Sequence, residues 1–160
     1  MSILQFAEAP SPFIHDSTPS QLLGGDRLLK HGVSTPLDAH ELIMQGIPGL
    51  ALVHLIESLD ALPKSASFEN ALGMSLRTFQ RRKSEPDAVL SMEQSARVWV
   101  FAERLAKAIA VFGSQAEAEH WMLEPAIGLD QHKPIDLMAT PAGGRLVDDL
   151  LERMRYGVYM

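Results

Sequence analysis

The strongest candidate for chemistry in this sequence is a cluster of cations in the middle of the chain. Arg77, Arg81, Arg82 and Lys83 lie within residues 73–83, a segment that contains no Asp or Glu. The chain as a whole is acidic, with 14 basic and 20 acidic residues and a net charge of −6 at pH 7. This average argues against nucleic-acid binding over the whole surface, but a local cluster of cations can still neutralise phosphates. We therefore expect any contact with nucleic acid to be confined to this segment.

The spacing around this cluster predicts a helix-turn-helix. Two short helices are expected over residues 65–72 and 75–84, with Gly73 supplying the turn between them. Ser75 can cap the second helix, and Arg or Gln side chains on such a helix can bond guanine or adenine in the major groove. The apolar residues that would lock the pair are Phe68, Leu72, Met74 and Phe79. The predicted DNA-binding residues are Ser75, Arg77, Thr78, Gln80, Arg81, Arg82 and Lys83.

Two residues depart from the usual helix-turn-helix pattern. Glu69 occupies a position where a small residue usually lets the helices approach, and Arg82 occupies a position where an apolar contact is common. The alternative interpretation is that the cations form only a solvated helix end, favoured there by the helix dipole. A basic cluster directly after a Gly turn, in an acidic chain, favours DNA binding over that alternative.

Other residue types that can do chemistry are not arranged for catalysis or metal binding. The sequence has no cysteine, and none of its six histidines follows another by three to five residues, as helical metal ligands do. Asp148, Asp149 and Glu152 are expected on the solvated face of an amphipathic helix. Gly143-Gly144 lacks the Lys and the Ser or Thr of a phosphate-binding loop. We therefore expect no catalytic residue, no metal, no cofactor and no enzymatic activity.

The elements that position these residues are predicted to be helical throughout. Helices are expected from Pro36 to Gly46, over residues 50–62, 92–112 and 115–123, in a short segment from Pro134, and from Pro141 onward. No segment alternates with a period of two, so the fold is predicted to be all-α. Residues 1–35 are expected to form an irregular arm, mobile or dependent on a partner, with one possible short helix over residues 21–31.

The sequence also argues against a place in a membrane. Its longest apolar stretch, residues 47–53, is far shorter than the ~20 residues that a membrane helix needs. Residues 1–15 contain no Lys or Arg, so they lack the charged start of a secretory signal. These features predict a cytoplasmic protein.

The end of the chain combines aromatic and apolar side chains. Residues 156–160 read Tyr-Gly-Val-Tyr-Met. Such a segment is unfavourable in water, so it should either pack on the body of the protein or enter a partner, and the sequence leaves both open. Trp121 raises the same question, because its indole can lie in the core or serve as an exposed anchor. Arg153 and Arg155 could interact with the helix dipole or contact the same partner.

From about Leu72 to its end the chain resembles the Xre-type antitoxins of the Xre/ParS (MbcA-like) group, the partners of RES-domain toxins. The resemblance rests on Leu76-Arg77-Thr78-Phe79-Gln80-Arg81-Arg82, on Ala108 to Gly113, on Trp121 followed by Pro125, on Pro134-Ile135-Asp136-Leu137, on Gly144 and Val147, and on Arg153-Met154-Arg155-Tyr156-Gly157-Val158-Tyr159. These blocks cover roughly half of the chain in the right order, and the Tyr-Gly-Val-Tyr ending is specific.

The resemblance implies a type II antitoxin with an N-terminal half that binds its own promoter and a C-terminal half that holds the toxin. RES-domain toxins consume NAD, and in relatives the last residues of the antitoxin block the toxin's active site. The implied division is an arm over residues 1–35, a DNA-binding and dimerisation region over residues 36–105 and a toxin-binding domain over residues 106–160. The implied toxin-binding residues are Trp121, Arg153, Arg155, Tyr156, Gly157, Val158, Tyr159 and Met160.

The expected partners are a RES-domain toxin, double-stranded promoter DNA with an inverted repeat, and a second copy of the chain. A homodimer is expected because two helix-turn-helix modules bind better than one, and because the helix over residues 92–112 is apolar over more than half its girth. The alternative function is a helical DNA-binding transcriptional regulator whose C-terminal domain binds a small ligand.

Overall fold

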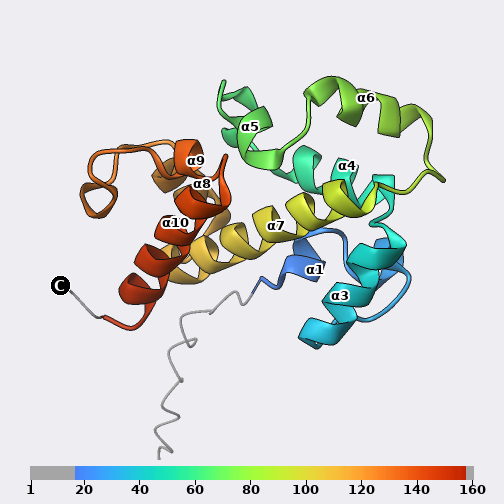
Figure 1. Ribbon diagram of the computed structural model, residues 1–160, viewed down its shortest axis with the longest axis horizontal. Helices are drawn as coiled ribbons and strands as arrows, with labels where there is room; N and C mark the ends of the chain where they lie inside the picture. The colour runs from blue at the N-terminus through green and yellow to red at the C-terminus, as the bar shows by residue number, and fades with distance from the viewer. Residues whose placement is uncertain (1–16, 158–160) are drawn as a thin grey trace, which may run out of the picture.

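The computed structural model describes residues 17–157, and within them the chain forms helices and no β-strand (Figure 1). The predicted all-α fold is therefore confirmed. The helices are α1 (Pro19–Leu22), α2 (Asp26–Leu29), α3 (Pro36–Gln45), α4 (Gly49–Ser58), η1 (Leu62–Lys64), α5 (Phe68–Leu72), α6 (Leu76–Ser84), α7 (Met92–Phe112), α8 (Gln115–Met122), η2 (Ile127–Leu129), α9 (Pro134–Leu137) and α10 (Pro141–Arg155). No helix in this part of the chain is both long and apolar enough to cross a membrane.

Helix α7 is the central element, and its bounds are those that the sequence predicted. The Ser91 hydroxyl accepts a hydrogen bond from the Gln94 N–H, and Gln94 Oε1 accepts one from the Ser91 N–H. Gly113 ends the helix in the left-handed conformation. Helices α1, α3, α5, α8 and α10 all pack against α7. The apolar girth that suggested a dimer interface is therefore largely covered by helices of the same chain.

Part of the predicted N-terminal arm is packed rather than irregular. Leu22, Leu23 and Leu29 are buried, and α1 lies against α7. The single helix predicted over residues 21–31 is divided into α1 and α2, because Gly24 and Gly25 both take positive φ angles. Burial of these leucines stabilises the segment from Ser17 onward, so the expectation of a mobile arm is wrong for this part of it. Residues 1–16 lie outside the described part.

The C-terminal helices pack on the second half of α7 through an ion pair and two small residues. The Arg104 guanidinium bonds both carboxylate oxygens of Asp148, at 3.2 and 3.4 Å. Gly144 is buried, and a Cβ atom there would lie only 2.1 Å from Arg104. Asp148 was predicted to be solvated and is instead part of this helix contact, whereas Asp149 and Glu152 are exposed as expected. The glycine pair therefore serves close packing rather than phosphate binding.

A buried carboxylate joins the two halves of the molecule. Glu119 of α8, only 2% exposed, accepts hydrogen bonds from the backbone N–H groups of Asp60, Ala61 and Leu62 at 3.0–3.2 Å. The side chain of Gln115 reaches the Ser58 carbonyl in the same place. Because these backbone donors turn toward α8, α4 ends at Ser58 and not at residue 62 as predicted. We call this contact the Glu119 clamp.

Candidate functional site

The turn before α6 is held by side chains on both of its sides. Gly73 has a φ of +78°, a left-handed conformation that favours glycine. Ser75 accepts a hydrogen bond from the Thr78 N–H, which confirms the predicted cap. The Glu69 carboxylate accepts a 2.8 Å bond from the Leu76 N–H at the first residue of α6. Glu69, unusual for its position in the sequence, is thus a second cap on the start of α6.

The residues predicted to lock the helix pair are all in the core. Phe68, Leu72, Met74 and Phe79 are each no more than 7% exposed. The Phe68 ring packs edge-on against Phe101 of α7, which anchors α5 to the central helix. The start of α6 is consequently fixed relative to the body of the protein.

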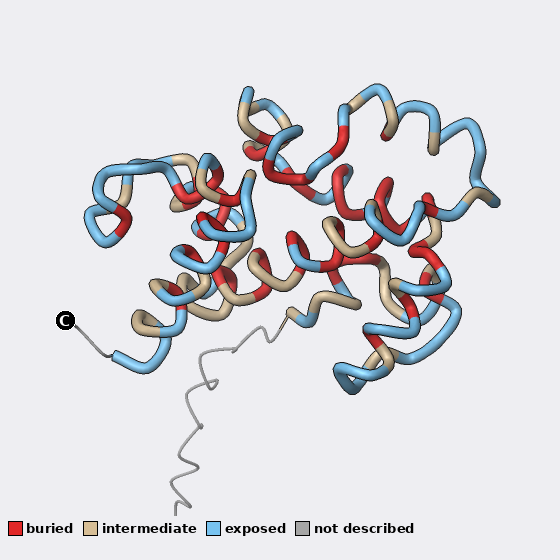
Figure 2. The backbone as a smooth tube through the Cα atoms, in the orientation of Figure 1, coloured by how far each residue is buried: buried red, intermediate tan, exposed pale blue. Residues whose placement is uncertain are grey.

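Helix α6 packs on α4 at the edge of the molecule, and most of its residues are exposed (Figures 1 and 2). Of the predicted DNA-binding residues, those that are exposed are Ser75, Arg77, Gln80, Arg81 and Lys83, while Thr78 and Arg82 are half-buried. Within residues 17–157, no carboxylate lies within 4.0 Å of the Arg77 or Arg81 guanidinium. These two arginines are four residues apart and so share one face of the helix.

The other two cations of α6 are partly used to hold the helix in place. Lys83 Nζ lies 2.9 Å from a Glu57 carboxylate oxygen on α4 and 5.7 Å from the Phe79 ring centroid. Arg82 has a side chain only 18% exposed, and its guanidinium lies 3.9 Å from Glu85. Its aliphatic stem passes close to Gly49, so Arg82 fills the apolar contact that its position in the motif usually provides. Arg77 and Arg81 are therefore the two cations of α6 most available to a ligand.

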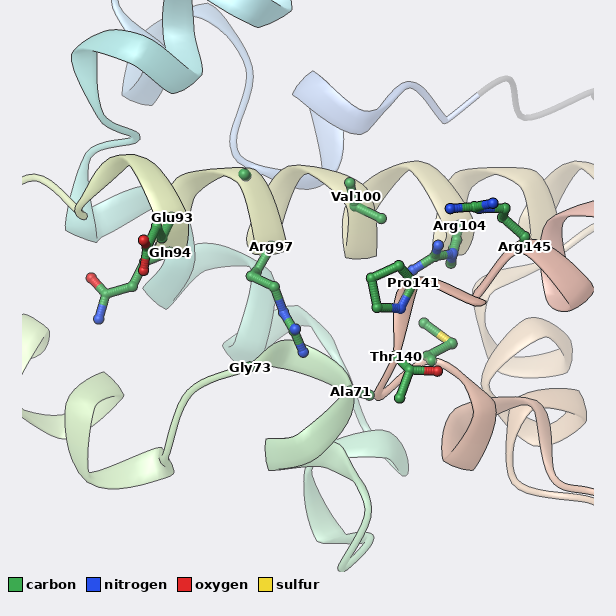
Figure 3. Close-up of a pocket in the computed structure, with 12 residues that line it drawn as sticks. Ala71, Gly73, Glu93, Gln94, Arg97, Val100, Arg104, Thr140, Pro141 and Arg145 are labelled. Carbon is green, nitrogen blue, oxygen red and sulfur yellow. The ribbon is translucent and has the colours of Figure 1, made fainter. Parts of the chain in front are cut away.

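A groove of about 670 Å³ runs beside α7, between the α5–α6 turn and the start of α10 (Figure 3). Three arginines line it, Arg97, Arg104 and Arg145, over an apolar floor that includes Val100. Arg97 donates a 3.0 Å bond to the Asn70 carbonyl and Arg104 pairs with Asp148, so two of these cations already bond protein groups. The groove separates the α6 region from the C-terminal helices.

The predicted C-terminal site residues fall into two places. Trp121 lies half-buried at the contact between α7 and α8, where its ring is 5.2 Å from that of Phe112. At the end of α10, Arg153 donates to the Asp149 carbonyl of its own helix, Arg155 lies over the Tyr156 ring, and Tyr156 is 72% exposed. Gly157 is exposed with a positive φ. Val158, Tyr159 and Met160 lie outside the described residues.

Comparisons with known proteins bear on both halves of the chain. Residues 107–157 match the family described as the antitoxin Xre/MbcA/ParS C-terminal toxin-binding domain. The chain is also 28% identical over 137 residues to a protein described as Antitoxin Xre from Yersinia enterocolitica serotype O:8 / biotype 1B, and this match covers 83% of the chain and 91% of the relative. Both matches support an Xre-type antitoxin. The toxin-binding match implies a toxin partner, and the family points to a regulatory protein.

The antitoxin contains functional contacts that the sequence reasoning missed. The toxin-binding match begins inside α7 and includes α8, η2, α9 and α10, so the Glu119 clamp connects it to the α4–α5 region. The only sequence signal for the clamp is that Gln115 and Glu119 share a helix face with the apolar Met122. No group of three or more His, Asp or Glu within residues 17–157 is close enough to hold a metal ion.

Proposed function

We propose that this antitoxin neutralises a RES-domain toxin and represses its own operon through α6. The observation that carries the DNA-binding half of the proposal is the exposed pair Arg77 and Arg81, with Gln80 between them. The start of their helix is capped by the side chains of Ser75 and Glu69. The major groove of DNA is about 12 Å wide and admits one helix. In this proposal Arg77, Gln80 and Arg81 contact base edges.

The remaining predicted residues of the site would contact the sugar-phosphate backbone. Ser75 and Thr78 carry hydroxyl groups at the start of α6, and Lys83 carries its cation at the end of the helix. Arg82 is half-buried and acts mainly by positioning α6. Two copies of the chain would bind half-sites one helical turn apart, in an inverted repeat. Both roles place the antitoxin in the cytoplasm, where the promoter lies.

In the toxin-binding half, we propose that the segment after α10 enters the active site of the NAD-consuming toxin. The family match over residues 107–157 supports a toxin contact in this half, and the exposed Tyr156 supports its extension into the tail. Tyrosine buries a large area with few rotatable bonds, as interface anchors do. Arg155 and Gly157, also exposed, would flank this anchor.

A crossed experiment tests both halves of the proposal. Arg77→Ala with Arg81→Ala should weaken promoter binding on the order of a hundredfold, because each guanidinium lost from a base edge costs about 1–3 kcal/mol. Its affinity for the toxin should not change. A chain lacking residues 156–160 should bind the promoter normally but leave cells unprotected, with NAD depleted.

The matched control for the double variant is Lys64→Ala with Arg27→Ala, which removes the same charge from exposed positions outside α6. Electrophoretic mobility shifts and NAD assays give the two readouts. Loss of both activities in either variant would contradict separate surfaces, and full protection by the truncated chain would reject tail insertion.

A further inference from the structure

Residues 126–132 form a small loop closed on itself by hydrogen bonds. The Ala126 N–H donates to the His132 carbonyl at 3.0 Å, and the Gln131 N–H donates to the Ala126 carbonyl at 2.9 Å. The Leu129 carbonyl accepts from the His132 backbone N–H at 3.1 Å, and the His132 ring nitrogen Nδ1 also lies 3.0 Å from it. The loop is therefore held in one conformation by its own backbone.

Two adjacent residues in this loop have strained backbones. Asp130 and Gln131 have φ angles of +55° and +64°, although neither is glycine. Side chains at such angles are unfavourable, and they persist only where the surrounding structure fixes the conformation. Strain of this kind is concentrated at binding and active sites in proteins. Neither the candidate DNA-binding residues of α6 nor the C-terminal tail uses this loop.

The loop buries one apolar residue and exposes another. Leu129 is 6% exposed and anchors the loop in the core, whereas Ile127, two residues earlier, is 86% exposed. Gly128 brings the loop onto α10, since a Cβ atom there would lie 2.8 Å from Leu150 Cδ1. Leu146, 54% exposed, lies one turn before Leu150 on the same side of α10. We call Ile127, Leu146 and Leu150 the apolar patch.

We propose that the apolar patch is a docking surface for the toxin, separate from the tail, with Ile127 as its anchor. This inference rests on the proposed toxin partner and names where on the domain that partner also binds. The patch lies wholly within residues 107–157, the part that matches the toxin-binding domain, and it is formed by η2 and by α10, the helix that leads into the tail. The complementary surface on the toxin is an apolar pocket that receives one branched aliphatic side chain.

The rigidity of the loop supports this role. Binding by a mobile loop loses affinity to the entropy of ordering it, whereas a preformed loop avoids most of that loss. Exposed isoleucine adds nothing to folding, because an 86% exposed side chain remains in water. Neither the backbone strain nor the exposure of Ile127 therefore stabilises the fold, whereas both are accounted for if Ile127 binds a partner.

The test compares Ile127→Asp with Ile127→Leu in the full-length chain, using the purified proposed partner, a RES-domain toxin, as the probe. Ile127→Asp should weaken toxin binding by about a hundredfold, as expected for loss of an interface anchor. Ile127→Leu should remain within about threefold of the original chain, because it keeps the apolar volume. Leu37→Asp, at a residue 64% exposed on α3, is the control and should leave the affinity unchanged. Thermal unfolding should be the same for all of these variants.

Unchanged toxin affinity in Ile127→Asp would overturn the inference. So would a variant that loses self-association in the absence of toxin while keeping its toxin affinity, since the patch would then contact a second copy of the chain. If the original antitoxin does not bind the toxin at all, the proposed partner itself is wrong. A chain that binds the toxin but is insensitive to Ile127→Asp leaves the proposed partner intact and rejects only the patch.

Discussion

The two ends of α7 carry surfaces of different chemistry. Beside its N-terminal end, α6 presents Arg77, Gln80 and Arg81, which are polar or charged and solvent-exposed. At its C-terminal end, η2 and α10 present the aliphatic side chains of Ile127 and Leu146. A charged surface attracts its partner over about 10 Å and is screened by salt, whereas an apolar one acts only on contact. In the proposed function, DNA and toxin would therefore be bound by different forces and at separate places.

The largest effect is expected at the Glu119 clamp, where a substitution should lower the stability of the contact between these ends. Glu119→Ala leaves the backbone N–H groups of Asp60, Ala61 and Leu62 without their acceptor and should lower the free energy of unfolding by about 3 kcal/mol. For a chain of this size, the melting temperature should fall by roughly 10 °C, measured by circular dichroism. Glu117→Ala, at an exposed position on the same helix, is the control. Equal stability of the two variants would mean that the ends are independent.

Promoter affinity and toxin affinity should differ in how strongly they depend on salt, an effect of intermediate size. Promoter affinity should fall steeply between about 50 and 200 mM salt, while toxin affinity at the apolar patch should change little. Arg81→Ala should weaken promoter binding about tenfold and reduce the salt slope by about 1 if the side chain also neutralises a phosphate. Arg27→Ala, which removes an exposed cation from α2, should leave the slope unchanged. If toxin affinity had the same salt slope as promoter affinity, the claim that the two surfaces bind by different forces would be wrong.

The smallest effect is expected at the ion pair between Lys83 and Glu57. Glu57→Gln removes a negative charge beside α6 and should raise promoter affinity about twofold, because Lys83 becomes available to phosphates. The cost in stability should be below about 1 kcal/mol, since both side chains are about half exposed. Glu41→Gln, at an exposed acid on α3, is the comparison for fluorescence-anisotropy titrations. A lower promoter affinity in Glu57→Gln would instead assign the pair to positioning α6.

Local sequence signals predicted the features that local interactions decide. Ser91 and Gly113 set the bounds of α7, and Ser75 caps α6, because caps and helix periodicity act within a few residues. The end of α4 and the ion pair of Asp148 were missed, because Glu119 and Arg104 reach these places across more than forty residues. A sequence gives the preference of each side chain but does not say which faces meet.

The same distinction applies to the candidate site. The basic segment was recognisable from composition alone, yet the partial burial of Arg82 depends on its contact with α4. Ile127 could not be recognised as exposed from the sequence either, since an isoleucine between Ala126 and Gly128 is as compatible with a buried side chain as with an exposed one. Its exposure follows from the turn that Asp130 and Gln131 complete, which only the fold reveals.

The Glu119 clamp also constrains how such proteins can recombine during evolution. A chimera that joins the first half of this chain to the C-terminal half of a relative would need a carboxylate at the position of Glu119, or the segment over residues 60–62 would lose its acceptor. New toxin specificities are therefore easier to acquire by changing surface residues of α10 and η2 than by exchanging the whole domain.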